Sequence, residues 1–196
     1  MSDSPIDINN EELDLIRGCV REERWAQKKL WDLYSKKLFS VCKRYLNSED
    51  EAEDCLIEAF SRILDKIGTF KNEGSFAGWM RRIVVNHCIN TLRKNKMVFC
   101  ELDSAMNEIE YVEEDKSDID AKSISLLIDK LPAGYKTVFN LYAVEGYKHK
   151  EISKMIGITE GTSRSQYAKA KKVLIIMVNK KYGENSFLWS TKESKK

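Results

Sequence analysis

The chain has 196 residues, enough for one ordinary domain or two small ones. Its nine Gly and two Pro are too few for the turns of a β-sandwich or β-barrel, so we predict an all-α fold. Its five cysteines are widely spaced and include no C-x-x-C pair, which argues against a disulfide framework or structural zinc, so no metal or cofactor is expected. No apolar run is long enough for a membrane span and the first residues do not resemble a signal peptide, so we expect a cytoplasmic protein.

The charge is unevenly distributed, although the net charge is only +2. Residues 1–96 carry 17 basic and 16 acidic side chains, residues 97–122 carry 2 and 9, and residues 123–182 carry 11 and 4. A segment as acidic as the middle one repels itself and is typical of an extended linker. We therefore predict two helical domains, 10–96 and 123–182, joined by an acidic flexible linker at 97–122 and followed by a short tail at 183–196.

Two helical segments are expected before residue 70. The first supplies apolar residues that we assign to the core: Leu30, Leu33, Leu38, Val41 and Tyr45. The second has a continuous apolar stripe at helical spacing: Ala52, Leu56, Ala59, Phe60, Ile63, Leu64 and Ile67. Its opposite face is charged, which usually indicates only a solvated surface helix. The sharper alternative is that this face contacts a protein partner.

A short polar loop at residues 70–75 precedes the next helix. It contains one aromatic residue, Phe70, and ends at Ser75, which is placed to cap the helix. Such a loop can hold an unstacked nucleic-acid base, because stacking and edge contacts offset the few kcal/mol of unstacking. Phe70 can equally plug the loop onto the core, and the residues alone leave both alternatives open.

The segment 75–96 combines a core face with a polar stripe. The expected core face consists of Phe76, Met80, Ile83, Val84, His87 and Cys88. The stripe consists of Arg82, Asn86, Asn90 and Arg93, with Trp79 at its head. Cations suit phosphates, amides suit base edges and an indole suits base stacking. We interpret the stripe as a nucleic-acid surface; the alternative is a solvated face with Trp79 in the core.

Residues 150–174 have the pattern of a helix-turn-helix. A short amphipathic helix ends at Gly157, which permits a left-handed backbone, and Thr159 is placed to cap the second helix. In that helix Ser163, Tyr167, Ala170 and Leu174 can face inward, whereas Arg164, Ser165, Lys169 and Lys172 point outward. This arrangement is typical of a helix that enters the DNA major groove, with base contacts near its start and phosphate contacts farther along. The alternative is an αα-hairpin with a lysine-coated surface.

Two single residues near the motif have expected positions. Pro132 marks the start of one of the helices that close the bundle, and His149 is expected at the surface and not as a metal ligand.

A stand-alone repressor would bind a palindromic site as a dimer and would leave the polar stripe without a role. An enzyme is not expected, because the chain has only two His and no Gly-rich phosphate loop.

Two blocks of the sequence resemble the extracytoplasmic-function group of bacterial RNA polymerase sigma factors. The first is A-E-D-C-L-I-E-A-F (52–60) with F-K-N-E-G-S-F-A-G-W-M-R-R-I-V-V-N (70–86), which is similar to region 2. The second is K-E-I-S-K-M-I-G-I-T-E-G-T-S-R-S (150–165), which is similar to region 4. The resemblance implies a factor that binds core polymerase, recognises the −10 and −35 promoter elements and promotes DNA melting.

The resemblance also assigns roles to individual residues. The surface that docks on the clamp helices of the largest polymerase subunit is matched by Glu53, Asp54, Glu58 and Arg62. Contacts with the −10 element, including a loop pocket for a flipped base, fall to Phe70, Lys71, Asn72, Ser75, Trp79, Arg82, Asn86, Asn90 and Arg93. Contacts with the −35 element fall to Thr162, Arg164, Ser165, Lys169 and Lys172.

The same resemblance implies a set of partners and one departure. The partners are core RNA polymerase, including the flap of its second-largest subunit, promoter DNA and a candidate anti-sigma factor. The chain is expected as a monomer when free or inhibited, without membrane insertion, and the acidic linker would follow the polymerase RNA path. Ser163 stands where the family often has an aliphatic residue and Gln166 where a basic one is common, which leaves the −35 preference open.

Overall fold

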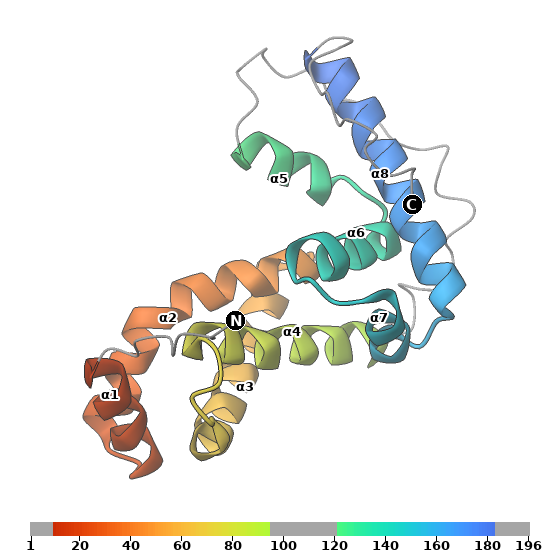
Figure 1. Cartoon of the computed structure of the whole chain (residues 1–196). Helices are drawn as coiled ribbons and strands as arrows, with labels where there is room; N and C mark the ends of the chain where they lie inside the picture. Colours follow the sequence, from red (N-terminus) through yellow and green to blue (C-terminus); the bar gives the residue numbers. More distant parts are fainter. Residues whose placement is uncertain (1–9, 95–120, 183–196) are drawn as a thin grey trace, which may run out of the picture. The chain divides into compact units, whose positions relative to one another are not determined.

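The computed structural model describes residues 10–94 and 121–182. Nearly all of the predicted linker at 97–122, and the predicted tail at 183–196, therefore lie outside the described residues. The chain divides into two compact units, Met1–Asn95 and Lys96–Lys196. Within the described ranges every regular element is helical, which confirms the predicted all-α fold with two helical units (Figure 1).

A three-helix core with one added helix forms the N-terminal unit. Its elements are α1 (Asn10–Val20), α2 (Arg24–Tyr45), α3 (Glu49–Lys66), the 3₁₀ turn η1 (Ile67–Thr69) and α4 (Phe76–Lys94). Helices α2, α3 and α4 each pack against the other two, and α1 packs against α2 and η1. The position of α4 is therefore fixed by two neighbouring helices at once.

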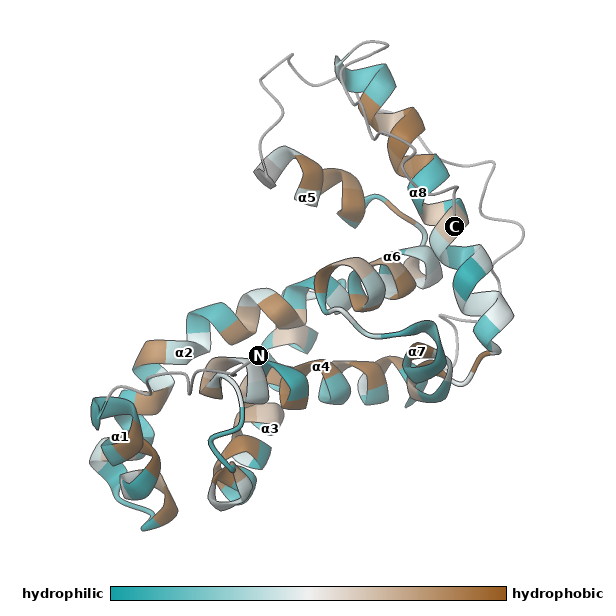
Figure 2. Ribbon diagram, viewed as in Figure 1, coloured by the Kyte–Doolittle hydropathy of each residue, from teal (hydrophilic) through white to brown (hydrophobic). Residues whose placement is uncertain are grey.

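The apolar stripe predicted on α3 forms much of this core. Its residues are buried except for Leu64, which is half-buried. Figure 2 shows the corresponding alternation of apolar and polar faces along the helices. On α2 the prediction is wrong for Leu33, which is 52% exposed. At about 100° per residue Leu33 lies roughly 100° from the middle of the buried face that contains Leu30 and Leu38, so it falls outside the core.

Helix α1 is joined to α2 by a close approach of the two helices and by a half-buried hydrogen bond. The Tyr34 hydroxyl donates a hydrogen bond of 2.9 Å to the Glu12 carboxylate. Burial, with this hydrogen bond, raises the pKa of Tyr34 to about 12. A Cβ atom placed on Gly18 would lie 2.7 Å from the Cβ of Ala26. Glycine at this position is therefore what lets the two helices approach each other.

The C-terminal unit consists of five helical elements in residues 121–182. They are α5 (Ala121–Asp129), α6 (Ala133–Phe139), the π-helical turn η3 (Asn140–Val144), α7 (His149–Ile156) and α8 (Glu160–Tyr182). Pro132 is the N-cap of α6, as predicted. Helices α5, α6 and α7 all pack against α8. The core of the C-terminal unit includes Leu127, Leu131, Tyr135, Phe139, Ala170, Val173, Met177 and Val178. Among the described residues, none of the helices is long and apolar enough to cross a bilayer.

Replacing Gly18 with Ala should lower the free energy of unfolding by about 1–3 kcal/mol, because the added methyl group overlaps Ala26 and forces α1 away from α2. Chemical denaturation followed by circular dichroism measures the change. Gly68→Ala is the matched control, since the nearest atom to its added Cβ is 3.9 Å away. Equal stabilities of the two variants would contradict the close approach.

Candidate nucleic-acid interface

The loop before α4 has a shape that its own residues favour. Asn72 and Gly74 both adopt left-handed backbone conformations, with φ of 58° and 83°, and Asn and Gly tolerate this region best. The Ser75 hydroxyl accepts a hydrogen bond of 3.0 Å from the Gly78 N–H, which confirms the predicted cap. The two left-handed positions were not predicted, although the N-E-G spacing of residues 72–74 is a usable signal for them.

An aromatic cluster connects this loop to the first turn of α4. The ring centroids of Phe70 and Phe76 are 5.1 Å apart, and Phe76 stacks on Trp79 at 5.7 Å. Phe76 is buried, whereas Phe70 and Trp79 are half-buried. Each ring therefore packs on the core and keeps an exposed part, and the nucleic-acid role of Phe70 and Trp79 stays a prediction.

The polar stripe of α4 lies on the solvent side, as predicted. Arg82, Asn86, Asn90 and Arg93 are all exposed. The predicted core face is buried except for Ile83, which is half-buried, and the burial also includes Val85, Ile89 and Leu92. The helix thus presents two amides and two guanidinium groups in one row while its other side holds the unit together.

A shallow hollow adjoins the C-terminal end of this stripe. It is lined by Arg62, His87, Asn90, Thr91, Arg93 and Lys94. Arg62 belongs to α3, so the structure places this arginine beside the stripe on α4, although the sequence analysis grouped it with the protein-contact residues. The packing of α3 on α4 shows this, because the apolar stripes predict which faces are buried but not which polar side chains become neighbours at their edges.

The outward face of α3 offers a different chemistry. Glu53, Asp54 and Glu58 are exposed, as predicted. Beside them lies an apolar hollow between α2 and α3, lined by Trp31, Phe39, Leu56 and Ile57 with Glu53 at its rim. Ile57 is 59% exposed. This hollow was not predicted, and the isoleucine within an otherwise charged face is the sequence signal for it.

The helix-turn-helix is formed by α7 and α8. Gly157 has a left-handed backbone with φ of 76°, and Thr159 accepts a hydrogen bond of 3.0 Å from the Thr162 N–H, so both predicted turn features are confirmed. The outward residues Arg164, Ser165, Lys169 and Lys172 are exposed. The second helix therefore presents a hydroxyl and three cations to solvent.

A buried polar pair holds the two helices of the motif together. His149 is only 8% exposed, so its predicted surface position is wrong. Its Nδ1 atom lies 2.9 Å from the hydroxyl oxygen of Ser163, and its ring stacks on Tyr142 at 4.3 Å between centroids. The serine that stands where an aliphatic residue is common therefore has a partner. The α7–α8 contact uses a polar pair in place of an apolar one.

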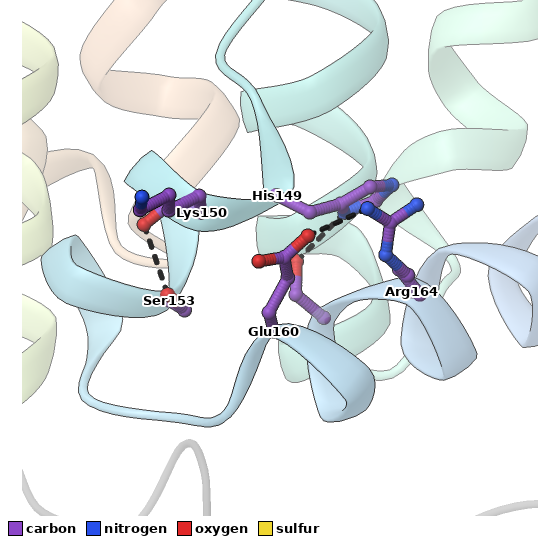
Figure 3. Close-up of polar contacts among 6 residues, drawn as sticks. His149, Lys150, Ser153, Glu160 and Arg164 are labelled. Atoms are coloured by element: carbon purple, nitrogen blue, oxygen red, sulfur yellow. Dashed lines mark hydrogen bonds and ion pairs between the residues drawn. The ribbon is translucent and has the colours of Figure 1, made fainter.

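Arg164 has an ion-pair partner on its own helix, Glu160, one turn earlier (Figure 3). Burial lowers the pKa of His149, and the nearby Arg164 cation lowers it further. Gln166 is buried, so it does not take the place of an exposed basic side chain on the outer face of α8. The exposed Arg164 guanidinium near the start of α8 is thus held by Glu160 in this structure.

His149 should titrate below about 6.5, the ordinary histidine pKa, because folding disfavours its charged form. The stability that this effect sustains is then complete above about pH 6.5 and is lost as the pH falls towards the lowered folded-state pKa. NMR titration of the full chain, with His149→Gln to identify the signal, measures the midpoint. Arg164→Ala should move it upward, and a wild-type midpoint at or above 6.5 would contradict the burial argument.

Two family models match this chain. Sigma-70 region 2 matches residues 30–97, and Sigma-70, region 4 matches residues 121–174. The first match begins within α2 and covers the loop and the stripe of α4, and the second covers the helix-turn-helix. Together the matches span more than half of the chain.

Several characterised proteins are similar over most of their length. The ECF RNA polymerase sigma factor SigW of Bacillus subtilis is 29% identical over 176 residues, which is 81% of this chain and 92% of the relative. SigM of Mycobacterium tuberculosis, also named an ECF RNA polymerase sigma factor, is 23% identical over 159 residues, covering 81% and 80%. The solved structure of RpoE with the anti-sigma factor NepR from Bartonella quintana aligns with a TM-score of 0.47 at 17% identity, over 78% of this chain and 96% of that one.

Proposed function

Since the chain belongs to the extracytoplasmic-function group of the sigma-70 family of RNA polymerase sigma factors, we propose that it binds core polymerase, recognises a two-part promoter and captures the opened −10 strand. The observation that carries the proposal is the exposed row of Arg82, Asn86 and Asn90 on α4, beside a half-exposed aromatic pair. No chemical step is assigned to the protein, which acts by binding.

The stripe and the aromatic cluster suit a single strand better than a duplex. Unpaired bases have free faces that stack on aromatic rings, worth about 1–3 kcal/mol per base, and free edges for amide groups. Phe70 and Trp79 supply the rings, with centroids 5.6 Å apart. Asn86 and Asn90 supply the amides, and Arg82 a cation for phosphate. In the proposal, Lys71, Asn72 and Ser75 line the loop that receives the flipped base.

Helix α8 suits the major groove of a duplex. Arg164 and Ser165 lie in its first two turns, where side chains reach base edges, whereas Lys169 and Lys172 are farther along and are placed for phosphates. Thr162, whose backbone N–H is held by Thr159, is the remaining proposed contact near the helix start. This helix is proposed to read the −35 element.

The acidic face of α3 and its apolar hollow suit a protein partner. Glu53, Asp54 and Glu58 are exposed, and the neighbouring Ile57 adds apolar area that favours burial. We assign this face to the clamp helices of the largest polymerase subunit. Arg62 is placed at its border with the α4 stripe, where it can serve either the protein or the nucleic acid contact.

These contacts would help to open the promoter duplex and would let the two units bind it together. Each base-pair step that opens costs about 1.4 kcal/mol of stacking, and capture of the strand on α4 offsets part of this cost. Each unit alone offers a small footprint and should bind DNA weakly. When the polymerase holds both units on one promoter, each raises the effective concentration of the other.

The triple variant Arg82→Ala/Asn86→Ala/Asn90→Ala should reduce promoter opening by the reconstituted holoenzyme at least tenfold, because about 1.4 kcal/mol of lost strand capture gives that factor. Permanganate reactivity of the unpaired thymines measures the opening. Lys28→Ala/Lys29→Ala, which removes two exposed cations of α2, is the control and should open normally. Normal opening by the triple variant would refute the role of the stripe.

Substitutions on α8 should separate base contacts from phosphate contacts. Lys169→Ala should weaken holoenzyme binding on all promoters and reduce the slope of log affinity against log salt by about 1. Arg164→Ala should instead relax sequence preference in the upstream element, at a cost of about 1–3 kcal/mol. Filter binding at several salt concentrations measures both. Lys180→Ala, in the last turn, is the matched control, and an equal effect of Lys180→Ala and Lys169→Ala would contradict the assignment.

A further inference from the structure

Three cysteines from three different helices meet in the core of the N-terminal unit. They are Cys42 of α2, Cys55 of α3 and Cys88 of α4, with exposed fractions of 0%, 3% and 0%. Their sulfur atoms all lie within 4.8 Å of one another, and those of Cys55 and Cys88 are 3.4 Å apart. Within the described part of the chain, no other three metal-ligating side chains are grouped in this way.

We propose that Cys42, Cys55 and Cys88 form a buried three-sulfur site for a soft monovalent metal ion, with Cu(I) as its probe. Thiolates select soft ions, and three of them satisfy an ion that accepts three ligands. With metal–sulfur bonds of about 2.3 Å in a flat triangle, the sulfur atoms would be about 4.0 Å apart. The Cys55–Cys88 separation is about 0.6 Å shorter than this value and the other two do not exceed 4.8 Å, so closure of the site needs shifts below about 1 Å.

Neither a structural zinc site nor a disulfide fits these three cysteines. Structural zinc takes four ligands, and no fourth His, Cys, Asp or Glu of the described chain joins this group. A disulfide between Cys55 and Cys88 would need an oxidant in a site that solvent does not reach, and it would leave the Cys42 thiol unused.

Metal binding must ionise the thiols, because the thiolate is the ligand. In the metal-free cluster, hydrogen bonds between the thiols lower the pKa of Cys55 and raise the pKa of Cys42 and Cys88. On metal binding, each thiol that becomes a ligand loses its proton to solvent and forms a sulfur–metal bond, and no electron is transferred. Because the site is closed, the ion must enter through local opening or during folding.

Anaerobic titration of the reduced full chain with Cu(I), in competition with a coloured Cu(I) chelator, tests the site. We expect one ion per chain, a shell of three sulfur atoms at about 2.3 Å by X-ray absorption, and a rise in the thermal midpoint of roughly 10 °C at saturation. A shell of two sulfurs, or no binding against the chelator, would show that the cysteines are only small apolar core residues and would overturn the proposal.

Variants distinguish this site from the chain's other thiols. Cys19, which is buried in α1, lies outside the cluster, and Cys100 lies outside the described residues. The double variant Cys19→Ser/Cys100→Ser removes both of these thiols and should bind Cu(I) like the wild type. Adding Cys42→Ala to this background should weaken binding by at least about a hundredfold, with circular dichroism reporting whether the helices persist. Unchanged affinity of that variant, or loss in the background alone, would contradict the three-sulfur site. If the variant unfolds, the wild-type sulfur shell decides. None of these measurements depends on the proposed promoter function.

Discussion

The N-terminal unit depends on α4 serving two purposes along the same 19 residues. One side of this helix is buried against α2 and α3, and this packing fixes its rotation about its own axis. Fixing the rotation places Arg82, Asn86 and Asn90 in one exposed row. The position of the aromatic cluster follows from the same packing, because Phe76 is buried while Trp79 stacks on it. If α4 were rotated about its axis by about 100°, the angle between successive residues, it would lose its core contacts and would no longer present Arg82, Asn86 and Asn90 to solvent.

In the C-terminal unit, packing must likewise fix which side of α8 faces solvent, and here a polar contact takes part in it. The α7–α8 contact is organised around a buried polar pair, His149 and Ser163. The His149 ring stacks on Tyr142, which makes a tilted contact with Tyr167. Burial keeps the imidazole from charging easily, and the cation of Arg164 on the outer face acts in the same direction. The internal pair and the exposed Arg164 cation are thus electrostatically linked, although the pair is buried and the cation is exposed to solvent.

Features set by local chemistry could be predicted from the sequence, whereas those set by packing between helices could not. The caps at Ser75 and Thr159 and the left-handed Gly157 follow from a few adjacent residues, and all three were predicted correctly. Leu33 was assigned to the core from hydropathy alone, but the neighbours of α2 leave it exposed. The cysteine cluster joins residues 13 and 33 positions apart, so no ligand spacing revealed it.

Site-specific photocrosslinking within one promoter complex tests most directly whether the two units contact separate promoter segments. A crosslinking amino acid in place of Asn86 on α4, and in a second preparation in place of Ser165 on α8, would be carried by holoenzyme on labelled DNA. The account predicts that Asn86 crosslinks to one strand of the opened −10 segment and Ser165 to the upstream duplex. Crosslinks from both positions to the same segment, or crosslinks that persist when core polymerase is omitted, would contradict it.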